Sequence, residues 1–167
     1  MGNINRGKQF ENQVKQAFES LPFTSIDRLH DQTSGFLGST NIADFIVFQQ
    51  PIQLYVECKS VHGNTLRISS NDYRRAYGDI SNNQMEGLIK KSYIKGVNAG
   101  IICWWVDHDI TRFLPIQYIF RQYLLGRKSI RYDDNGVDII DIPAVKKRVF
   151  FDYDMQALIN ELKKECE

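Results

Sequence analysis

A carboxylate and an ammonium group lie two residues apart in the apolar segment LYVECKSVHGN, residues 54 to 64. Successive side chains of a β-strand point to opposite faces, so Glu57 and Lys59 should lie side by side on one face. Leu54 and Val56 would then fill a core on the other face. Neighbouring charges are also common on the wet face of an antiparallel strand, so this pair alone does not assign a chemical role.

A second carboxylate is expected opposite Glu57. The segments 43 to 48 and 52 to 60 are typical of two strands, and the QQPI sequence between them favours a hairpin. A turn centred on the Gln-Pro bond would place Asp44 directly across from Glu57. Directly opposed Cβ atoms lie ~4.5 to 5.5 Å apart, and two like charges at that distance destabilise a sheet unless a positive charge lies between them.

Such a pair of carboxylates predicts a divalent-cation site. Mg²⁺ prefers hard oxygen ligands, usually one or two carboxylates together with water and phosphate. Asp44 and Glu57 would supply the carboxylates, and the backbone carbonyl of Cys58 would add a further ligand. Lys59, on the same face, would orient an attacking water or stabilise charge that builds on a phosphate group. Magnesium is therefore the expected cofactor, with manganese as a substitute.

Length and composition favour one compact domain over residues 1 to 167, since 43% of the residues are apolar and 12% aromatic. No apolar run approaches the ~20 residues of a membrane span, and the N-terminal segment lacks the apolar middle region of a signal peptide. We therefore expect no membrane association and a cytoplasmic location. The three cysteines are far apart and form no C-x-x-C, which argues against a disulfide framework and a zinc site.

The charge is distributed unevenly along the chain. Residues 59 to 131 carry twelve Lys and Arg against five Asp and Glu, a net of +7, whereas residues 1 to 58 sum to −2 and residues 132 to 167 to −4. A basic middle between acidic ends favours a phosphate-binding surface, and a solvated helix face would give the same count.

An α/β pattern is expected to position these residues. The first helix has an apolar stripe that includes Phe10, Val14 and Phe18, with Glu11 at its edge. Segment 61 to 79 mixes Arg and Tyr without a clear period and is interpreted as a loop. Helices are expected over residues 5 to 20, 82 to 93 and 116 to 125 and after Asp154. Strands are expected over residues 26 to 29, 43 to 48, 52 to 60, 99 to 106, 111 to 114, 137 to 142 and 149 to 151.

Several ordered motifs resemble known nucleases. The pattern ADF…VECK resembles the PD-(D/E)xK nuclease superfamily, with an Asp on one strand and E-x-K on the next. NRGKQFENQVKQAF resembles the opening helix of the RecU family of Holliday junction resolvases, and twelve residues separate Asp44 from Glu57, as in that family. NNQMEGLIKK and GRKSIRYDD resemble its later motifs. The resemblance covers most of the chain and implies a restriction-endonuclease-like fold, a mixed central sheet flanked by helices.

The resemblance also implies roles for individual residues. Asp44 and Glu57 would bind metal and Lys59 would serve the catalytic step. Glu11 would reach the site from the first helix, and Gln84 would contact the scissile phosphate or a water on the metal. Arg6 would touch the DNA backbone.

Two segments depart from the family. The region before Asp44, where cellular members build a stalk that enters the junction, is shorter here, and the region between Lys59 and Gln84 is longer. The longer segment could supply substitute DNA contacts through the four side chains of Arg67, Arg74, Arg75 and Tyr77.

These observations predict a Mg²⁺-dependent, structure-selective endonuclease of DNA recombination and repair that resolves four-way (Holliday) junctions. A symmetric homodimer is expected, because two strands of opposite polarity must be cut at symmetric positions. Its apolar contact surface could come from IICWWV or from IQYIFRQYLL, although both could equally be core. A sequence-specific or repair endonuclease of the same superfamily and a non-catalytic DNA-binding domain with this fold remain open alternatives.

Overall fold

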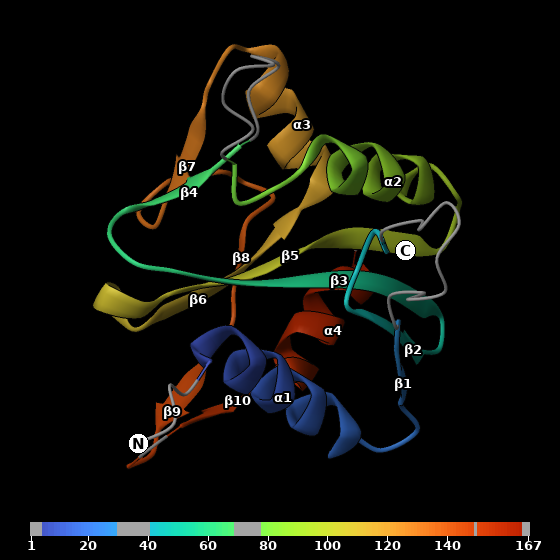
Figure 1. Ribbon diagram of the computed structural model, residues 1–167. Helices are drawn as coiled ribbons and strands as arrows, with labels where there is room; N and C mark the ends of the chain where they lie inside the picture. Colours follow the sequence, from blue (N-terminus) through green and yellow to red (C-terminus); the bar gives the residue numbers. More distant parts are fainter. Residues whose placement is uncertain (1–4, 30–40, 69–77, 149, 165–167) are drawn as a thin grey trace, which may run out of the picture.

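The computed structural model describes residues 5–29, 41–68, 78–148 and 150–164. Its centre is a six-stranded sheet with the strand order β1-β2-β3-β5-β6-β8 (Figure 1). The strands of this sheet are β1 (Ser25–Arg28), β2 (Phe45–Gln49), β3 (Ile52–Val61), β5 (Val97–Trp105), β6 (Ile110–Pro115) and β8 (Ile140–Asp141). The expected mixed α/β sheet flanked by helices is confirmed.

Only one neighbouring pair of strands in this sheet, β3 and β5, runs parallel. A parallel pair needs a long crossover, and here the crossover contains helix α2 (Asn82–Ser92). The β2–β3 pair is the antiparallel hairpin that the sequence predicts, and β5 and β6 form a second antiparallel pair. The β3 strand therefore lies inside the sheet, with α2 passing over the face to which its odd-numbered side chains point (Figure 1).

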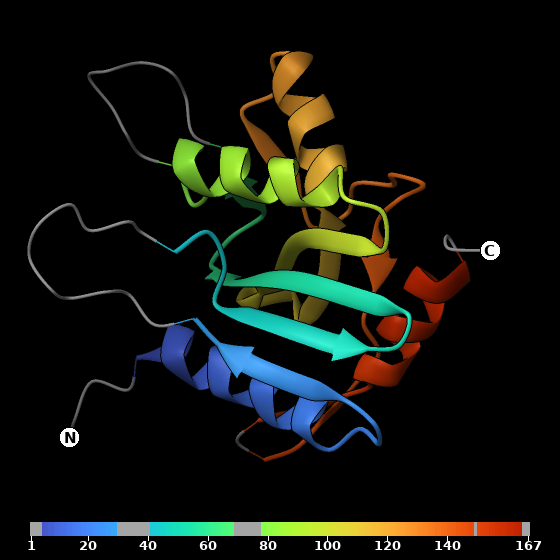
Figure 2. The same ribbon diagram turned by 90° about the vertical axis from the view of Figure 1, so that its right-hand side faces the viewer.

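Helices cover both faces of the sheet (Figure 2). Helices α1 (Arg6–Glu19) and α4 (Met155–Lys164) pack on one face, where Phe10 and Leu158 join the core with Leu54 and Val56 of β3. Helices α2 and α3 (Ile116–Leu124) pack on the other face. The alternation of β3 therefore turns its even-numbered residues toward α1 and α4 and its odd-numbered residues toward α2.

Local signals in the sequence explain where the helices begin. Asn5 caps α1 by accepting a hydrogen bond from the Lys8 backbone N–H, and Asp154 accepts one from Ala157 at the start of α4. Ser81 and Gln84 form a reciprocal capping box at the start of α2. None of the helices in the described residues is long and apolar enough to span a membrane.

The elements that the sequence predicts least well lie outside the central sheet. Part of the expected 61 to 79 loop forms strand β4 (Thr65–Arg67), which pairs with β7 (Ser129–Arg131) far along the chain. Strand β9 (Ala144–Lys146) was not expected, and it pairs with β10 (Phe151–Tyr153), which replaces the strand expected at 149 to 151. These short strands depend on distant partners, and periodicity within three residues does not reveal such partners.

Of the two apolar segments considered for dimer contact, IICWWV lies in β5 apart from its last residue, Val106, and β5 runs between β3 and β6. The residues of IICWWV are buried apart from the partly exposed Trp104 and Val106, so this segment is core and not a contact surface. Helix α3 also buries its first half, whereas Leu124 and Leu125 at its end are 68% and 72% exposed.

Candidate active site

The Glu57 carboxylate lies buried on the α2 face of β3. Glu57 is only 6% exposed, and its Oε1 atom accepts hydrogen bonds from Lys59 Nζ at 2.7 Å and from Gln84 Nε2 at 2.7 Å. Strand alternation brings Lys59 beside Glu57, as the sequence predicts. A buried acid that accepts hydrogen bonds from two donors is not a solvated surface residue. Glu57 and Lys59 are therefore not simply neighbouring charges on the wet face of a strand.

Asp44 approaches the same point from the start of β2. The hairpin has the predicted register, with Phe45 opposite Val56, and regular pairing ends there. The Asp44 backbone N–H donates to the Val56 carbonyl at 2.9 Å, while Asp44 Oδ2 accepts from the Cys58 N–H at 2.7 Å. The Asp44 side chain therefore points past the last strand pair toward the Cys58 backbone. It does not lie directly opposite Glu57, where the sequence predicts it to be.

Both carboxylates are costly to ionise, and the charge of Asp44 adds to the cost for Glu57. Burial, followed by the charge of Asp44, raises the pKa of Glu57 to about 7, although Lys59 and Gln84 act in the opposite direction. Burial is also the main cause that raises the pKa of Asp44, the Cys58 N–H lowers it, and the charge of Glu11 raises it further. Burial is therefore the main reason that the charged forms of both carboxylates are unfavourable.

This donor set fits a hard divalent cation. Burial disfavours the charged form of both carboxylates, a bound cation would stabilise that form, and hard oxygen ligands are those that Mg²⁺ prefers. The described residues contain no group of three or more His, Cys, Asp and Glu side chains arranged to hold a metal, so the protein would contribute Asp44, Glu57 and backbone oxygen. The Cys58 side chain is core on the α1 face, where burial raises its thiol pKa, and only its carbonyl remains a predicted ligand.

Glu11 lies near this site but faces a different partner. Its Oε2 atom is 3.1 Å from Nη2 of Arg28 on β1, and its charge contributes to the raised pKa of Asp44. Arg28, which sequence reasoning missed, also lies 5.0 Å from the centre of the Phe45 ring. The only sequence signal for Arg28 is that it is a cation inside a short expected strand. The sequence does not show which residue of β2 lies opposite it.

Gln84 supports Glu57 directly. Its amide nitrogen donates to Glu57 Oε1, while its amide oxygen accepts from the Ser81 backbone N–H at 3.1 Å. Because the helix cap fixes the amide oxygen, the amide nitrogen is held toward the carboxylate. The structure thus brings Gln84 to the predicted site, in contact with a carboxylate; its contact with a phosphate or with a water on the metal stays a prediction.

We expect Gln84→Ala to lower the free energy of unfolding by about 1 to 2 kcal/mol, because it removes a helix cap and a hydrogen bond to a buried acid. Asn83→Ala, at an exposed position of the same helix, should change it by less than about 0.5 kcal/mol. Urea unfolding of the two variants measures the difference, and equal values would contradict the role assigned to Gln84.

The predicted DNA-contacting residues are only partly described. Arg6 begins α1, and its Nη1 lies 3.2 Å from His62 Nε2. Arg67 is exposed on β4 and pairs with Asp79 at 3.2 Å. The remaining three, Arg74, Arg75 and Tyr77, lie outside the described residues.

Acidic residues offset much of the basic middle of the chain. Four arginines of that region pair with aspartates from residues 133 to 141: Arg112 with Asp141, Arg121 with Asp138, Arg127 with Asp134 and Arg131 with Asp133. The net charge of +7 over residues 59 to 131 therefore overstates the positive charge at the protein surface, because aspartates from residues 133 to 141 pair with its arginines.

Comparison of the sequence with models of known protein families finds no match, and comparison with curated proteins finds none. Among solved structures, the chain is similar to Hjc, a Holliday junction resolvase from Archaeoglobus fulgidus. The identity is 18%, the TM-score is 0.46, and the match covers 68% of this chain and 75% of Hjc. So distant a likeness assigns no activity, and the function is inferred from the site itself.

Proposed function

We propose that this protein is a Mg²⁺-dependent endonuclease that resolves four-way DNA junctions by paired, symmetric phosphodiester hydrolysis. The observation that carries the proposal is the buried Glu57 carboxylate, which receives hydrogen bonds from Lys59 and Gln84 and lies within the electrostatic influence of Asp44. Perturbed titratable groups gathered at one point favour a functional site over a structural ion pair.

Each residue of the site has a separate proposed role. Asp44 and Glu57 would hold the cation. When bound there, Mg²⁺ would supply Lewis-acid stabilisation of negative charge on the phosphate. Gln84 holds Glu57 in place, and Arg28 compensates part of the negative charge through Glu11. Below pH 7 a proton on Glu57 competes with the cation, so cleavage at limiting Mg²⁺ should increase as the pH rises through the Glu57 pKa of about 7.

Lys59 is the proposed source of positive charge during cleavage. Its Nζ atom lies 2.7 Å from Glu57 and its side chain is 23% exposed, so it reaches from the buried acid toward solvent. We expect Lys59→Met to reduce the cleavage rate by about 10²- to 10³-fold, because it removes charge stabilisation in the transition state. Junction affinity should change by less than about threefold, since binding depends on many phosphate contacts.

The control for this prediction is Lys90→Met, which removes the same charge from an exposed position on α2 and should leave the rate unchanged. Single-turnover cleavage and gel-shift binding measure the two effects. If Lys59→Met unfolds the protein, as followed by circular dichroism, Lys59 is structural and the catalytic assignment is wrong.

The choice of a four-way junction rests on the RecU-like motifs and on geometry. Two sites fixed in a two-fold dimer would match phosphates on two strands of opposite polarity, which a branch point presents and a linear duplex does not. Mapping the cut positions on both strands tests this. Cuts placed symmetrically about the branch, with a solution mass of twice the 19.4 kDa chain, are expected. A monomer that cuts linear duplex equally well would instead indicate a repair or sequence-specific endonuclease.

A further inference from the structure

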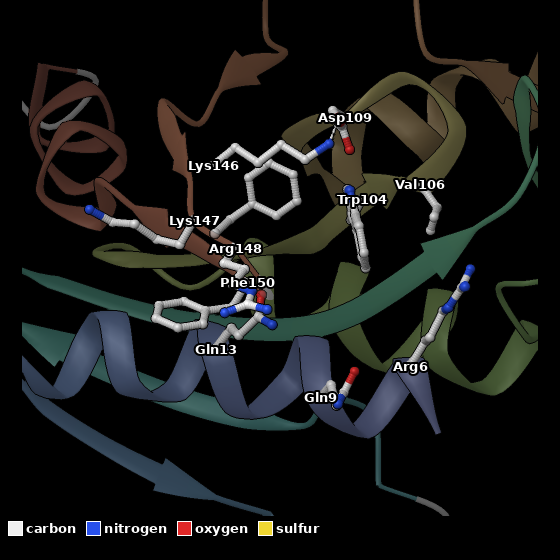
Figure 3. Close-up of a pocket in the computed structure, with 11 residues that line it drawn as sticks. Arg6, Gln9, Gln13, Trp104, Val106, Asp109, Lys146, Lys147, Arg148 and Phe150 are labelled. Carbon is white, nitrogen blue, oxygen red and sulfur yellow. Dashed lines mark hydrogen bonds and ion pairs between the residues drawn. The ribbon is translucent and has the colours of Figure 1, made fainter. Parts of the chain in front are cut away.

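A hollow of about 270 Å³ lies beside the first turns of α1, away from Glu57. The β5–β6 connection and the β9–β10 hairpin form its other walls (Figure 3). Arg6 rises from α1 on one side, Arg148 and Phe150 lie on the other, and Trp104 stands between them (Figure 3). This volume is just below the ~300 to 1,000 Å³ of small-molecule sites, so the hollow suits one small group.

The lining of the hollow is cationic. Arg6, Lys146, Lys147 and Arg148 face one carboxylate, Asp109, which gives a net of +3. Asp109 is already paired with Lys146 at 2.5 Å. The structure gives Arg148 no ion pair within the described residues, and Arg148 is exposed. Uncompensated guanidinium charge at an open hollow favours an anion, and a planar guanidinium suits a phosphate in particular.

Aromatic side chains lie beside these cations. Phe150 is 52% exposed, so its ring is accessible to a ligand. Trp104 is partly exposed, and its buried indole N–H has no acceptor within the described residues. Phe151 meets the Trp104 ring edge-on at 5.7 Å and so supports its position. Cations interleaved with open aromatic rings are the arrangement that binds unpaired nucleotides.

This hollow is separate from the catalytic carboxylates. Gln9 and Gln13 line it and lie one turn apart on α1, whereas Glu11 lies between them in sequence and points to the opposite flank, toward Arg28. Neither Asp44 nor Glu57 contributes to its lining. The hollow therefore requires a role of its own.

We propose that this hollow binds one unpaired nucleotide of a DNA strand, with its phosphate on Arg148 and its base against Phe150 and Trp104. The inference rests on the proposed function only in taking DNA as the ligand. The enzyme then binds branched DNA that carries a single-stranded segment near the branch more tightly than fully paired DNA.

Titration with an oligothymidylate of about twelve nucleotides, within the ~4 to 16 nucleotides of single-strand binding sites, tests the proposal. EDTA prevents cleavage, and quenching of tryptophan fluorescence reports binding. Arg148→Ala and Phe150→Ala should each raise Kd about tenfold, since stacking and charge contribute comparably. Trp104→Phe should remove most of the quenching, because Trp105, the second of two tryptophans, is fully buried.

Matched controls are Arg121→Ala, an exposed arginine on α3, and Phe23→Ala, a ring that is 97% exposed elsewhere; both should leave Kd within about twofold. An unchanged Kd in Phe150→Ala would overturn the proposal, because only backbone phosphate would then be bound. So would an Arg148-dependent preference for an oligoglutamate peptide over the oligonucleotide. If the protein cuts no DNA but the titrations hold, the proposed function fails and the nucleotide site stands.

Discussion

Replacing Asp44 by Asn or Glu57 by Gln should reduce cleavage of a four-way junction by at least about a thousandfold. Each change removes a carboxylate charge from the proposed cation site and, with it, several kcal/mol of transition-state stabilisation. Both replacements keep the size of the side chain. An Asn at position 44 retains an oxygen to accept the Cys58 N–H, and a Gln at position 57 retains one for Lys59 and Gln84.

Junction affinity in the same variants should be unchanged or higher, because an acidic group that faces phosphate loses its charge. The matched control is Asp138→Asn, which neutralises a surface carboxylate paired with Arg121 and should leave the rate within about twofold. Single-turnover cleavage with labelled junction separates rate from binding. Full activity of Asp44→Asn at ordinary Mg²⁺ would remove Asp44 from the site.

The second large effect concerns stability in the absence of metal. Burial and the charge of Asp44 raise the pKa of Glu57 from its ordinary value of 4.5 to about 7, so the folded protein binds more protons than the unfolded chain between these two pH values. Its stability should therefore fall as the pH rises from 4.5 to 7 and remain lower above pH 7. A shift of this size corresponds to about 3 kcal/mol.

Glu57→Gln removes this penalty. In EDTA at pH 8 we expect the variant to be more stable than the parent protein by about 3 kcal/mol, and at pH 4.5 the two should differ by less than about 1 kcal/mol. Added Mg²⁺ should stabilise only the parent, since a ligand stabilises the state that binds it. Urea unfolding at both pH values, with and without Mg²⁺, measures this. A destabilised Glu57→Gln at pH 8 would show that the charged acid is needed for folding.

The sequence predicts the centre of the fold because its signals there are local. Turn residues between two β-rich segments determine the β2–β3 register, strand alternation brings Lys59 beside Glu57, and Ser81 caps the start of α2. Each of these relations depends on residues close in sequence or on one hairpin, so periodicity and turn chemistry reveal them.

The relations that the sequence did not reveal are long-range. Arg28 meets Glu11 across 17 positions, and β4 pairs with β7 through residues more than sixty positions apart. Asp141 forms an ion pair with Arg112. Counting charges along the sequence therefore did not show which charges lie close together in the fold. The basic hollow at Arg148 was missed for the same reason, since its walls come from three separate parts of the chain.

The most direct test of the proposed activity is incubation of the purified protein with a four-way junction and with a linear duplex of the same sequence, each with Mg²⁺ and with EDTA. We expect paired cuts in the junction with Mg²⁺, at least about tenfold slower cutting of the duplex, and no cutting of either DNA in EDTA. Equal cutting of junction and duplex would contradict structure selectivity, and cutting that persists in EDTA would contradict the cation site at Asp44 and Glu57.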